Sequence, residues 1–287
     1  MQLFFEQILN GLAIGSIYAL ITLGLALVYG ILRILHVAHA AVYTVGAYVG
    51  LAIYSRTSTL LLAVPGSMLS CVLLGIAIER FVYFPLLKYP PYVPLISSIA
   101  LFLGLEELCR IVAGPELLTF PATLPFPSFS VAGVMVSGTT VTVYAVTIAV
   151  LAALWFVTAK TEFGLAMRAA SLDMEVASSL GVNSKLVVDA TFAIGSAIAS
   201  LAGILVGIYY NQVYSTMGTM PAYKSLALIV VGGMGSTVGT VLASFLLGLG
   251  ETLLISFANI PLPRDALAFI AMILVLMWKP TGLLGKR

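Results

Sequence analysis

The sequence predicts an all-α fold, a polytopic transmembrane helical bundle with about eight membrane elements. Hydrophobic residues make up 61% of the 287 residues and charged residues only 8%, and the mean hydropathy is +1.13. Soluble domains carry roughly 25% charged residues, so a soluble core does not account for this composition. The chain also contains a series of uncharged apolar runs near the length of about 20 residues that one membrane crossing requires.

Seven apolar runs predict ordinary crossings, and short polar connections separate most of them. In chain order they cover residues 8–30, 37–54, 60–78, 93–113, 139–158, 190–208 and a shorter run at 266–278. Rows of small residues at four-residue spacing, such as Gly195, Ala199 and Gly203 in the sixth run and Gly11, Gly15 and Ala19 in the first, let helix backbones approach closely. We therefore expect these rows to pack helix against helix.

The segment 222–258 is apolar for longer than one crossing, but a glycine cluster interrupts it. The cluster reads Gly-Gly-Met-Gly-Ser over residues 232–236, and glycine at this density breaks a helix. Lipid cannot satisfy a non-helical backbone, which must be buried in protein or line a cavity. The pattern predicts either a re-entrant pair of half-helices or two short spans, and both return the chain to the same side.

Basic residues in the connections predict the orientation. Alternating crossings place one group of basic residues together: Arg33, Arg80, Lys88, Lys160, Arg168, Lys185, Lys279, Lys286 and Arg287. The other side receives Arg56, Arg110, Lys224 and Arg264. The richer side is expected to be cytoplasmic, which places the N-terminus outside and the C-terminus inside. The connection 115–138, stiffened by Pro121, Pro125 and Pro127, then becomes an external loop suited to docking something from outside.

No catalytic or metal constellation stands out in the sequence. The phosphate-binding pattern G-x-x-x-x-G-K-[ST] does not occur. His36 and His39 are the only histidines, and Cys71 and Cys109 stand alone in apolar segments. We therefore expect no catalytic residue, no metal and no cofactor in this chain. The net charge of +2 is too small to predict a nucleic-acid partner, and membrane lipid is the expected surrounding.

The most charged stretch of the chain lies between the fifth and sixth crossings, within a cytoplasmic loop at 159–185. It reads TEFGLAMRAASLDMEVASSLGVNSKLVV from Thr161 to Val188. Helix-forming residues at 162–170 and 174–180 predict two short helices, the second closed by Gly181. On charge alone, this stretch could equally be a solvated loop.

Four segments in order give the chain a family resemblance. They are NGLAIGSIYALITLGLALVYGILRILHVAHAAVYTVGAYVG near the start, the loop residues Arg168-Ala169-Ala170, Asp173, Ala177 and Leu180-Gly181-Val182, then AYKSLALIVVGGMGSTVGTVLASFLLGLGETL, and the closing Lys279-Pro280-Thr281-Gly282-Leu283-Leu284-Gly285. The chain resembles the branched-chain amino-acid permeases of bacterial ABC importers, of the LivH type, over nearly its whole length.

The resemblance implies a single permease domain over residues 1–287 in the bacterial cytoplasmic (inner) membrane. Such a subunit translocates branched-chain or related amino acids and is not itself the enzyme. Its implied partners are a second homologous permease subunit, two cytoplasmic ATPase subunits and a soluble external substrate-binding protein. The loop 159–185 is then the coupling loop that contacts an ATPase, with Arg168, Asp173, Glu175, Ala177 and Gly181 as its coupling residues.

One departure from the family pattern concerns the substrate. Residues 36–41 read His-Val-Ala-His-Ala-Ala, where the family usually has Asn-Phe-Ala-His-Gly and then an acidic or small residue. The histidine is kept as His39, whereas the Asn, Phe and Gly are replaced. The related urea and short-chain amide permeases therefore remain an alternative, and an ion-coupled secondary transporter or a channel are further rivals.

Residues of several kinds are candidates to line the translocation path. Ionisable residues within a membrane are functional candidates by default, and Glu251 has no partner within a helical turn. The other candidates are His39, Tyr43, Gly232, Gly233 and Gly235. His39 and Tyr43 lie one turn apart, and a hydrogen-bonded packing role is the alternative for them. We expect Glu106 to pair with Arg110, four residues later, on one helix face.

Overall fold

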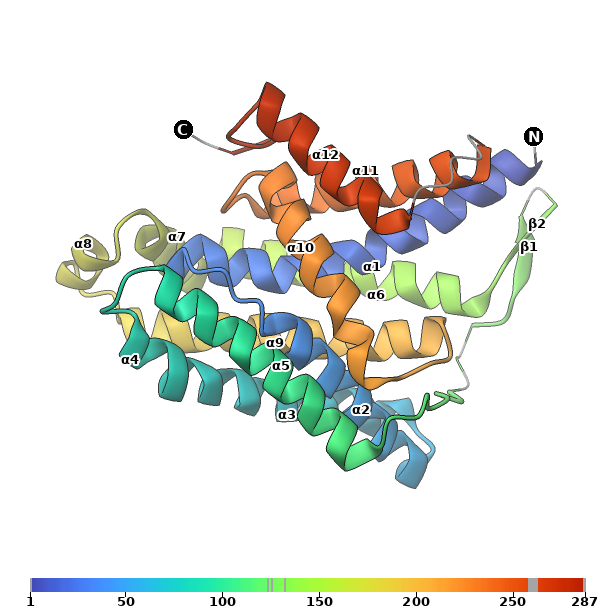
Figure 1. Ribbon diagram of the computed structural model, residues 1–287, viewed down its shortest axis with the longest axis horizontal. Helices are drawn as coiled ribbons and strands as arrows, with labels where there is room; N and C mark the ends of the chain where they lie inside the picture. Colours follow the sequence, from blue (N-terminus) through green and yellow to red (C-terminus); the bar gives the residue numbers. More distant parts are fainter. Residues whose placement is uncertain (1, 123, 125, 132, 258–262, 286–287) are drawn as a thin grey trace.

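A computed structural model describes residues 2–285, except 123, 125, 132 and 258–262. Pro125, Ala258, Lys286 and Arg287, which entered the sequence predictions, lie outside the described residues. Figure 1 shows a bundle built almost entirely of helices, which confirms the predicted helical fold. The longer helices are α1 (Gln2–Leu32), α2 (His39–Thr57), α3 (Leu60–Ile78), α5 (Tyr92–Ala113), α6 (Gly138–Lys160), α9 (Ser184–Tyr209) and α11 (Thr237–Phe257).

Shorter helices complete the bundle. They are α4 (Phe84–Leu86), α7 (Glu162–Leu172), α8 (Met174–Ser179), α10 (Thr219–Gly232), α12 (Arg264–Trp278), the π-helix η1 (Glu79–Tyr83) and the 3₁₀ helix η2 (Ser215–Gly218). Within the described part of the chain, five helices are long and apolar enough to cross a membrane: α1, the continuous stretch Leu60–Leu86, α6, α9 and α11. The predicted runs at 37–54 and 93–113 form α2 and α5.

Helix α1 runs through the middle of the bundle and packs closely on α11. A β-carbon at Gly15 would lie only 2.9 Å from the Cα of Phe245, so this contact requires glycine. Gly11 meets Leu249 further along the same pair of helices, which shows that α1 and α11 are antiparallel. The predicted small-residue row in α1 therefore does pack helix against helix.

The glycine cluster breaks the helix where the sequence predicts. Helix α10 ends at Gly232 and α11 begins at Thr237, with Gly233 at φ +107° and Gly235 at φ +88°. Leu283 and Leu284 donate their backbone N–H groups to the carbonyls of Val231 and Gly232, at 2.8 and 3.0 Å. The closing segment of the chain thus satisfies carbonyls that the helix end leaves open.

The predicted external loop contains a small β-hairpin, the one addition to the helical fold among the described residues. Strands β1 (Phe129–Val131) and β2 (Val134–Val136) pair antiparallel, with Phe129 opposite Val136 and Gly133 at φ +82° in the connection. The hairpin was not predicted, because the prolines of the segment indicate an irregular loop. A pair of strands this short lacks the length for an alternating pattern to stand out.

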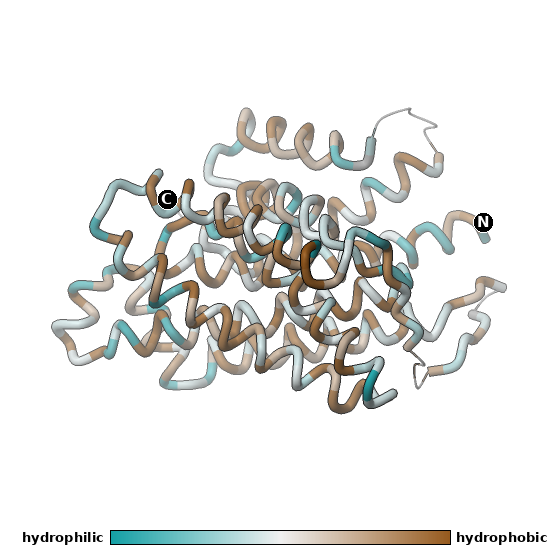
Figure 2. The backbone as a smooth tube through the Cα atoms, turned by 60° about the horizontal axis from the view of Figure 1, so that its bottom comes forward, coloured by the Kyte–Doolittle hydropathy of each residue, from teal (hydrophilic) through white to brown (hydrophobic). Residues whose placement is uncertain are grey.

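The predicted external and cytoplasmic loops lie at opposite ends of the bundle. In Figure 1, β1 and β2 extend at one end and α7 and α8 project at the other. Helix α1 begins at the hairpin end, whereas the helix break at 233–236 lies at the α7–α8 end. Figure 2 shows hydrophobic residues along the helices and hydrophilic residues mainly at their ends and in the connections. Because α1 begins at the hairpin end and α10 ends at the α7–α8 end, the chain crosses the bundle an odd number of times between these two points.

Candidate functional site

A lysine and a glutamate form an ion pair deep inside the bundle. The Nζ atom of Lys224 on α10 lies 2.9 Å from Oε1 and 3.0 Å from Oε2 of Glu251 on α11. The two side chains are only 5% and 2% exposed. Buried charges are costly unless they are paired and hydrogen-bonded, and this pair meets both conditions.

A tyrosine hydroxyl closes the pair into a triangle. Lys224 Nζ donates to Tyr18 Oη at 2.6 Å, and Tyr18 Oη donates to Glu251 Oε2 at 2.9 Å. A second carboxylate, Asp265 at the start of α12, lies 3.4 Å from Lys224 Nζ. The cluster therefore joins α1, α10, α11 and α12. It contains one ammonium and two carboxylates, so its formal charge is 1 − 2 = −1.

This cluster corrects part of the sequence analysis. Glu251 has no partner within its own helical turn, as predicted, but it is paired with a residue 27 positions earlier in the chain. Lys224 is buried in this pair instead of standing in a connection. Lys224 and Glu251 are the only charged residues between 222 and 258, one of each sign. Two lone charges of opposite sign in one apolar segment could have indicated the pair, whereas nothing in the sequence points to Tyr18 as its partner.

A cavity of about 240 Å³ lies beside the cluster, and the Lys224 side chain forms part of its lining. The residues around it come from α1, α2, α9, the connection between α9 and η2, η2 itself and α10: Ile17, Tyr18, Ile21, Tyr43, Val206, Tyr210, Gln212, Tyr214, Met217, Met220, Pro221 and Lys224. We call it the tyrosine cavity. Four phenol rings, an amide and an ammonium group give it a polar character within an otherwise apolar bundle.

The two path candidates on α2 lie in different surroundings. Tyr43 is buried and borders the tyrosine cavity. His39 is also buried, and its ring lies against Gly24 of α1 and near His36, with 5.7 Å between the ring centres. His36 in turn shares a 2.6 Å hydrogen bond between Nδ1 and the hydroxyl of Tyr83. The structure thus brings Tyr43, but not His39, to the cavity beside Lys224.

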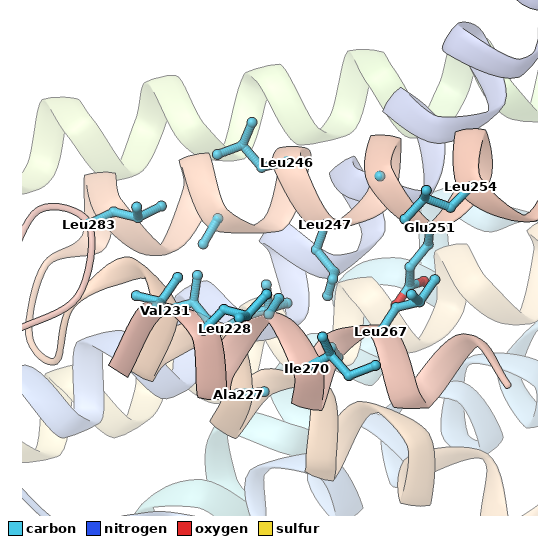
Figure 3. A pocket seen from close by; sticks show the side chains of 16 residues that line it. Ala227, Leu228, Val231, Leu246, Leu247, Glu251, Leu254, Leu267, Ile270 and Leu283 are labelled. Atoms are coloured by element: carbon cyan, nitrogen blue, oxygen red, sulfur yellow. The ribbon is translucent and has the colours of Figure 1, made fainter. Parts of the chain in front are cut away.

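A second cavity, of about 340 Å³, lies on the opposite side of the ion pair between α10, α11 and α12. Figure 3 shows its lining of aliphatic side chains, with Glu251 near one end beside Leu254 and Leu267. We call it the apolar cavity. Because Glu251 borders the apolar cavity and Lys224 borders the tyrosine cavity, the ion pair stands between the two.

The predicted cytoplasmic loop forms two helices, α7 and α8, which confirms the expectation from its helix-forming residues. Asp173 caps α8, since its Oδ1 accepts the backbone N–H groups of Glu175 and Val176 at 2.9 and 3.0 Å. Ala177 is buried, and Gly181 has φ +93° after the end of α8. Arg168 donates to the carbonyl of Thr158 at the end of α6, which fixes α7 to the bundle.

The outer surface of α7 and α8 carries exposed apolar side chains beside its exposed charges. Its exposed large side chains are Leu165, Leu172, Val176 and Leu180. We call this surface the α7–α8 platform. Leu172 and Leu180 are 82% and 81% exposed, although apolar side chains gain by leaving water. An exposed apolar surface of this kind is typical of a site for another protein.

The ion pair of Arg110 forms with a different glutamate from the one predicted. Arg110 binds Glu107 at 2.7 Å, three residues earlier, and both side chains are more than half exposed. The predicted pairing of Glu106 with Arg110 is wrong. Spacings of three and four residues both place side chains on one helix face, so the sequence did not distinguish the two glutamates. In the part of the chain that the structure describes, no three His, Cys, Asp or Glu side chains gather as metal ligands would.

A bundle of membrane-length helices that holds charges and a polar cavity in its interior is the architecture of a membrane transport protein. The chain belongs to the family described as the permease component of branched-chain amino acid transport systems, whose model matches residues 7–277. It is accordingly a multi-pass protein of the cytoplasmic membrane.

Named relatives support this assignment over the full chain. BraD of Pseudomonas aeruginosa, a high-affinity branched-chain amino acid transport system permease protein, is 32% identical over 99% of this chain and 96% of its own length. LivH of Escherichia coli, which carries the same description, shows the same identity and coverage. The galactofuranose transporter permease YtfT of Escherichia coli is 25% identical over 79% of this chain and 61% of its own. No solved structure matches the chain.

Proposed function

We propose that this chain is the permease subunit of an ATP-driven importer of branched-chain amino acids. The observation that carries the proposal is the full-length similarity to BraD and LivH, which are described as permease proteins of branched-chain amino acid transport systems. Urea and short-chain amides were left open by the replacements around His39. The similarity to branched-chain amino acid permeases extends along the whole chain, which favours the amino-acid reading over that short segment.

Energy for import comes, in this proposal, from separate ATPase subunits bound on the cytoplasmic side, and the chain itself uses no cofactor. The α7–α8 platform supports this arrangement because it offers exposed leucines on a helical pair at the predicted cytoplasmic end. The remaining partners are a second homologous permease subunit and a soluble binding protein. The latter docks at the opposite end, where the loop 115–138 lies.

The coupling residues then have distinct roles. Asp173 caps α8 and Arg168 ties α7 to α6, so these two residues hold the platform in position. Ala177 packs the inner side of α8. Glu175 is exposed and offers a charge to the ATPase, while Gly181 allows the turn from α8 into α9. ATP-driven closure of the ATPase pair pushes on the platform, and α7 passes the movement to α6 and α1.

Two substitutions test the coupling role. Glu175→Arg reverses an exposed charge, and Gly181→Val places a β-branched residue at a left-handed position that such residues resist. Both variants should insert and fold, whereas substrate-stimulated ATP hydrolysis and leucine uptake should fall together in the reconstituted complex. Glu6→Arg makes the same charge reversal at the exposed start of α1 and should leave coupling intact.

The same measurements separate this proposal from its rivals. Uptake of leucine with no ATPase bound would overturn the ATP-driven importer and establish an ion-coupled secondary transporter. ATP-dependent uptake of urea, with no uptake of leucine, would keep the importer class but change its substrate. Rapid flux without any energy source would point to a channel.

A further inference from the structure

We propose that Lys224, which Glu251 holds in place, and the tyrosine cavity form a binding subsite within the membrane bundle for the zwitterionic head of an amino acid. This inference rests on the proposed function and deepens it by naming the residues and the ligand chemistry. Its basis is the position of Lys224, one member of a buried ion pair, in the lining of a cavity that carries both polar and apolar side chains.

The ammonium group of Lys224 is placed to receive a carboxylate. It has three hydrogen-bond donors, and its present acceptors are the Tyr18 hydroxyl, at 2.6 Å, and the carboxylate of Glu251. The side chain also borders the cavity. A ligand carboxylate entering there can replace the Tyr18 hydroxyl, which exchanges a neutral acceptor for a charged and stronger one.

The excess negative charge of the cluster suits the other end of a zwitterion. Glu251 and Asp265 together carry two carboxylates around one ammonium. When a ligand carboxylate binds Lys224, the nearby carboxylates of Glu251 and Asp265 favour a ligand ammonium, which the phenol rings and the Gln212 amide of the cavity lining can contact. Binding of a zwitterion leaves the net charge unchanged, which matters because a new net charge is costly at this depth. Urea and neutral amides bring neither charge and cannot bind in this way.

The rest of the cavity matches a small ligand with an apolar side chain. Its volume of about 240 Å³ lies below the range of about 300–1,000 Å³ usual for drug-sized ligands. Ile17, Ile21 and Met217 offer apolar surface, and Gln212 and the tyrosines offer polar groups on the same cavity. This combination suits an aliphatic amino acid better than a sugar, which would need polar partners on every side.

The cavity also lies directly behind the predicted external loop. Leu118 of that loop pairs with Val213 through two backbone hydrogen bonds of 2.9 and 2.8 Å. Side chains alternate along an extended backbone, so Gln212 and Tyr214 point away from Val213, and both border the cavity. Gln212 and Tyr214 therefore connect the segment that pairs with the external loop to the lining of the cavity.

Protection of a single cysteine tests the subsite without disturbing the ion pair. Met220 borders the cavity and is 44% exposed, so Met220→Cys places a thiol there, in a chain that also carries Cys71→Ala and Cys109→Ala. The reconstituted permease–ATPase complex, without binding protein, is labelled with a small thiol reagent. We expect leucine to slow labelling. 3-Methylbutylamine, which lacks the carboxylate, and 4-methylpentanoate, which lacks the ammonium, should protect at least about tenfold less well.

Substitutions of Lys224 then test whether its charge is responsible for the protection by leucine. Lys224→Gln should weaken leucine protection by about tenfold or more, as expected for loss of a charge-assisted hydrogen bond. Lys224→Arg should retain most of it. Lys88→Gln removes an exposed lysine from another connection and should change nothing. Size-exclusion behaviour and ATPase binding are measured for each variant, so that a misfolded protein is recognised.

Two results would overturn the subsite. If leucine does not slow labelling, or if all three compounds slow it equally, the cavity does not recognise a zwitterion. If Lys224→Gln folds and keeps full protection, the ion pair only ties the helices together. Either result leaves the proposed function standing when ATP-driven leucine uptake is intact. Loss of ATPase binding in the unmodified complex would instead defeat the proposed function.

Discussion

Lys224 and Glu251 are charged residues enclosed by apolar helices, whereas Leu172 and Leu180 are apolar residues exposed at one end of the bundle. Both regions reverse the usual pattern of burial, and they do so in opposite directions. The buried pair is held by neighbours on four helices, so its removal should affect folding as well as transport. The exposed leucines contact little else in this chain, so their removal should affect only what binds there.

The comparison therefore separates two ways in which a residue can matter. A buried charge contributes through its partner, because either charge alone would be stranded in the bundle. An exposed apolar residue contributes through another molecule, since within the monomer it gains nothing from its position. Stability measurements and transport measurements should consequently disagree at the platform, and they should agree where a single member of the ion pair is removed.

The largest effect on stability is expected from Glu251→Leu. This change leaves Lys224 with Asp265, at 3.4 Å, as its remaining carboxylate, and breaking a buried pair by removing one partner costs about 3–5 kcal/mol. The expected loss lies near the lower end, about 3 kcal/mol, because Asp265 compensates in part. Thermal unfolding of the purified protein in detergent measures it.

The double variant Lys224→Leu/Glu251→Leu is the matched control for that change. It removes both charges and should recover most of the lost stability, because buried ion pairs are often replaceable by apolar residues. Transport should remain lost in the double variant, since the charges are gone. If Glu251→Leu alone unfolds like the unmodified protein, water reaches the pair, and the contrast with the platform disappears.

A smaller effect is expected from Gly233→Ala at the helix break. Gly233 has φ +107°, a backbone conformation that residues with a side chain rarely adopt. Its neighbour in space is Gly285 of the closing segment. Strain of this kind costs about 1–3 kcal/mol. Gly250→Ala in α11 is the control, because a β-carbon there would meet no atom within 4 Å. Equal stability of the two variants would show that the closing segment adapts to a side chain.

The sequence allowed most of the helical architecture to be predicted, for a physical reason. Lipid forces each crossing to satisfy its own backbone, so an apolar run of sufficient length has few alternatives to a helix. The break after Gly232 was also predictable, because clustered glycines destabilise a helix locally. Gly181 likewise marked the end of α8 through a local capping preference.

The candidate site was less predictable because its contacts are distant in sequence. Tyr18 and Glu251 are separated by 233 positions, and no local pattern encodes such a pairing. The β1–β2 hairpin escaped notice because its strands are short and follow several prolines. The partner of Arg110 was mistaken because two acceptable carboxylates lie on the same helix face, at spacings that local geometry does not distinguish.

The smallest effect on stability, and a large effect on transport, is expected from Leu180→Glu. Leu180 is 81% exposed on the α7–α8 platform, and surface substitutions of this kind usually change stability by no more than about 0.5 kcal/mol. A charge placed in an apolar contact with an ATPase must lose its water without gaining a partner, so ATPase binding, ATP hydrolysis and leucine uptake should fall at least about tenfold. Leu180→Met preserves the apolar contact and should retain all three. Full uptake by Leu180→Glu would show that the platform does not seat the ATPase.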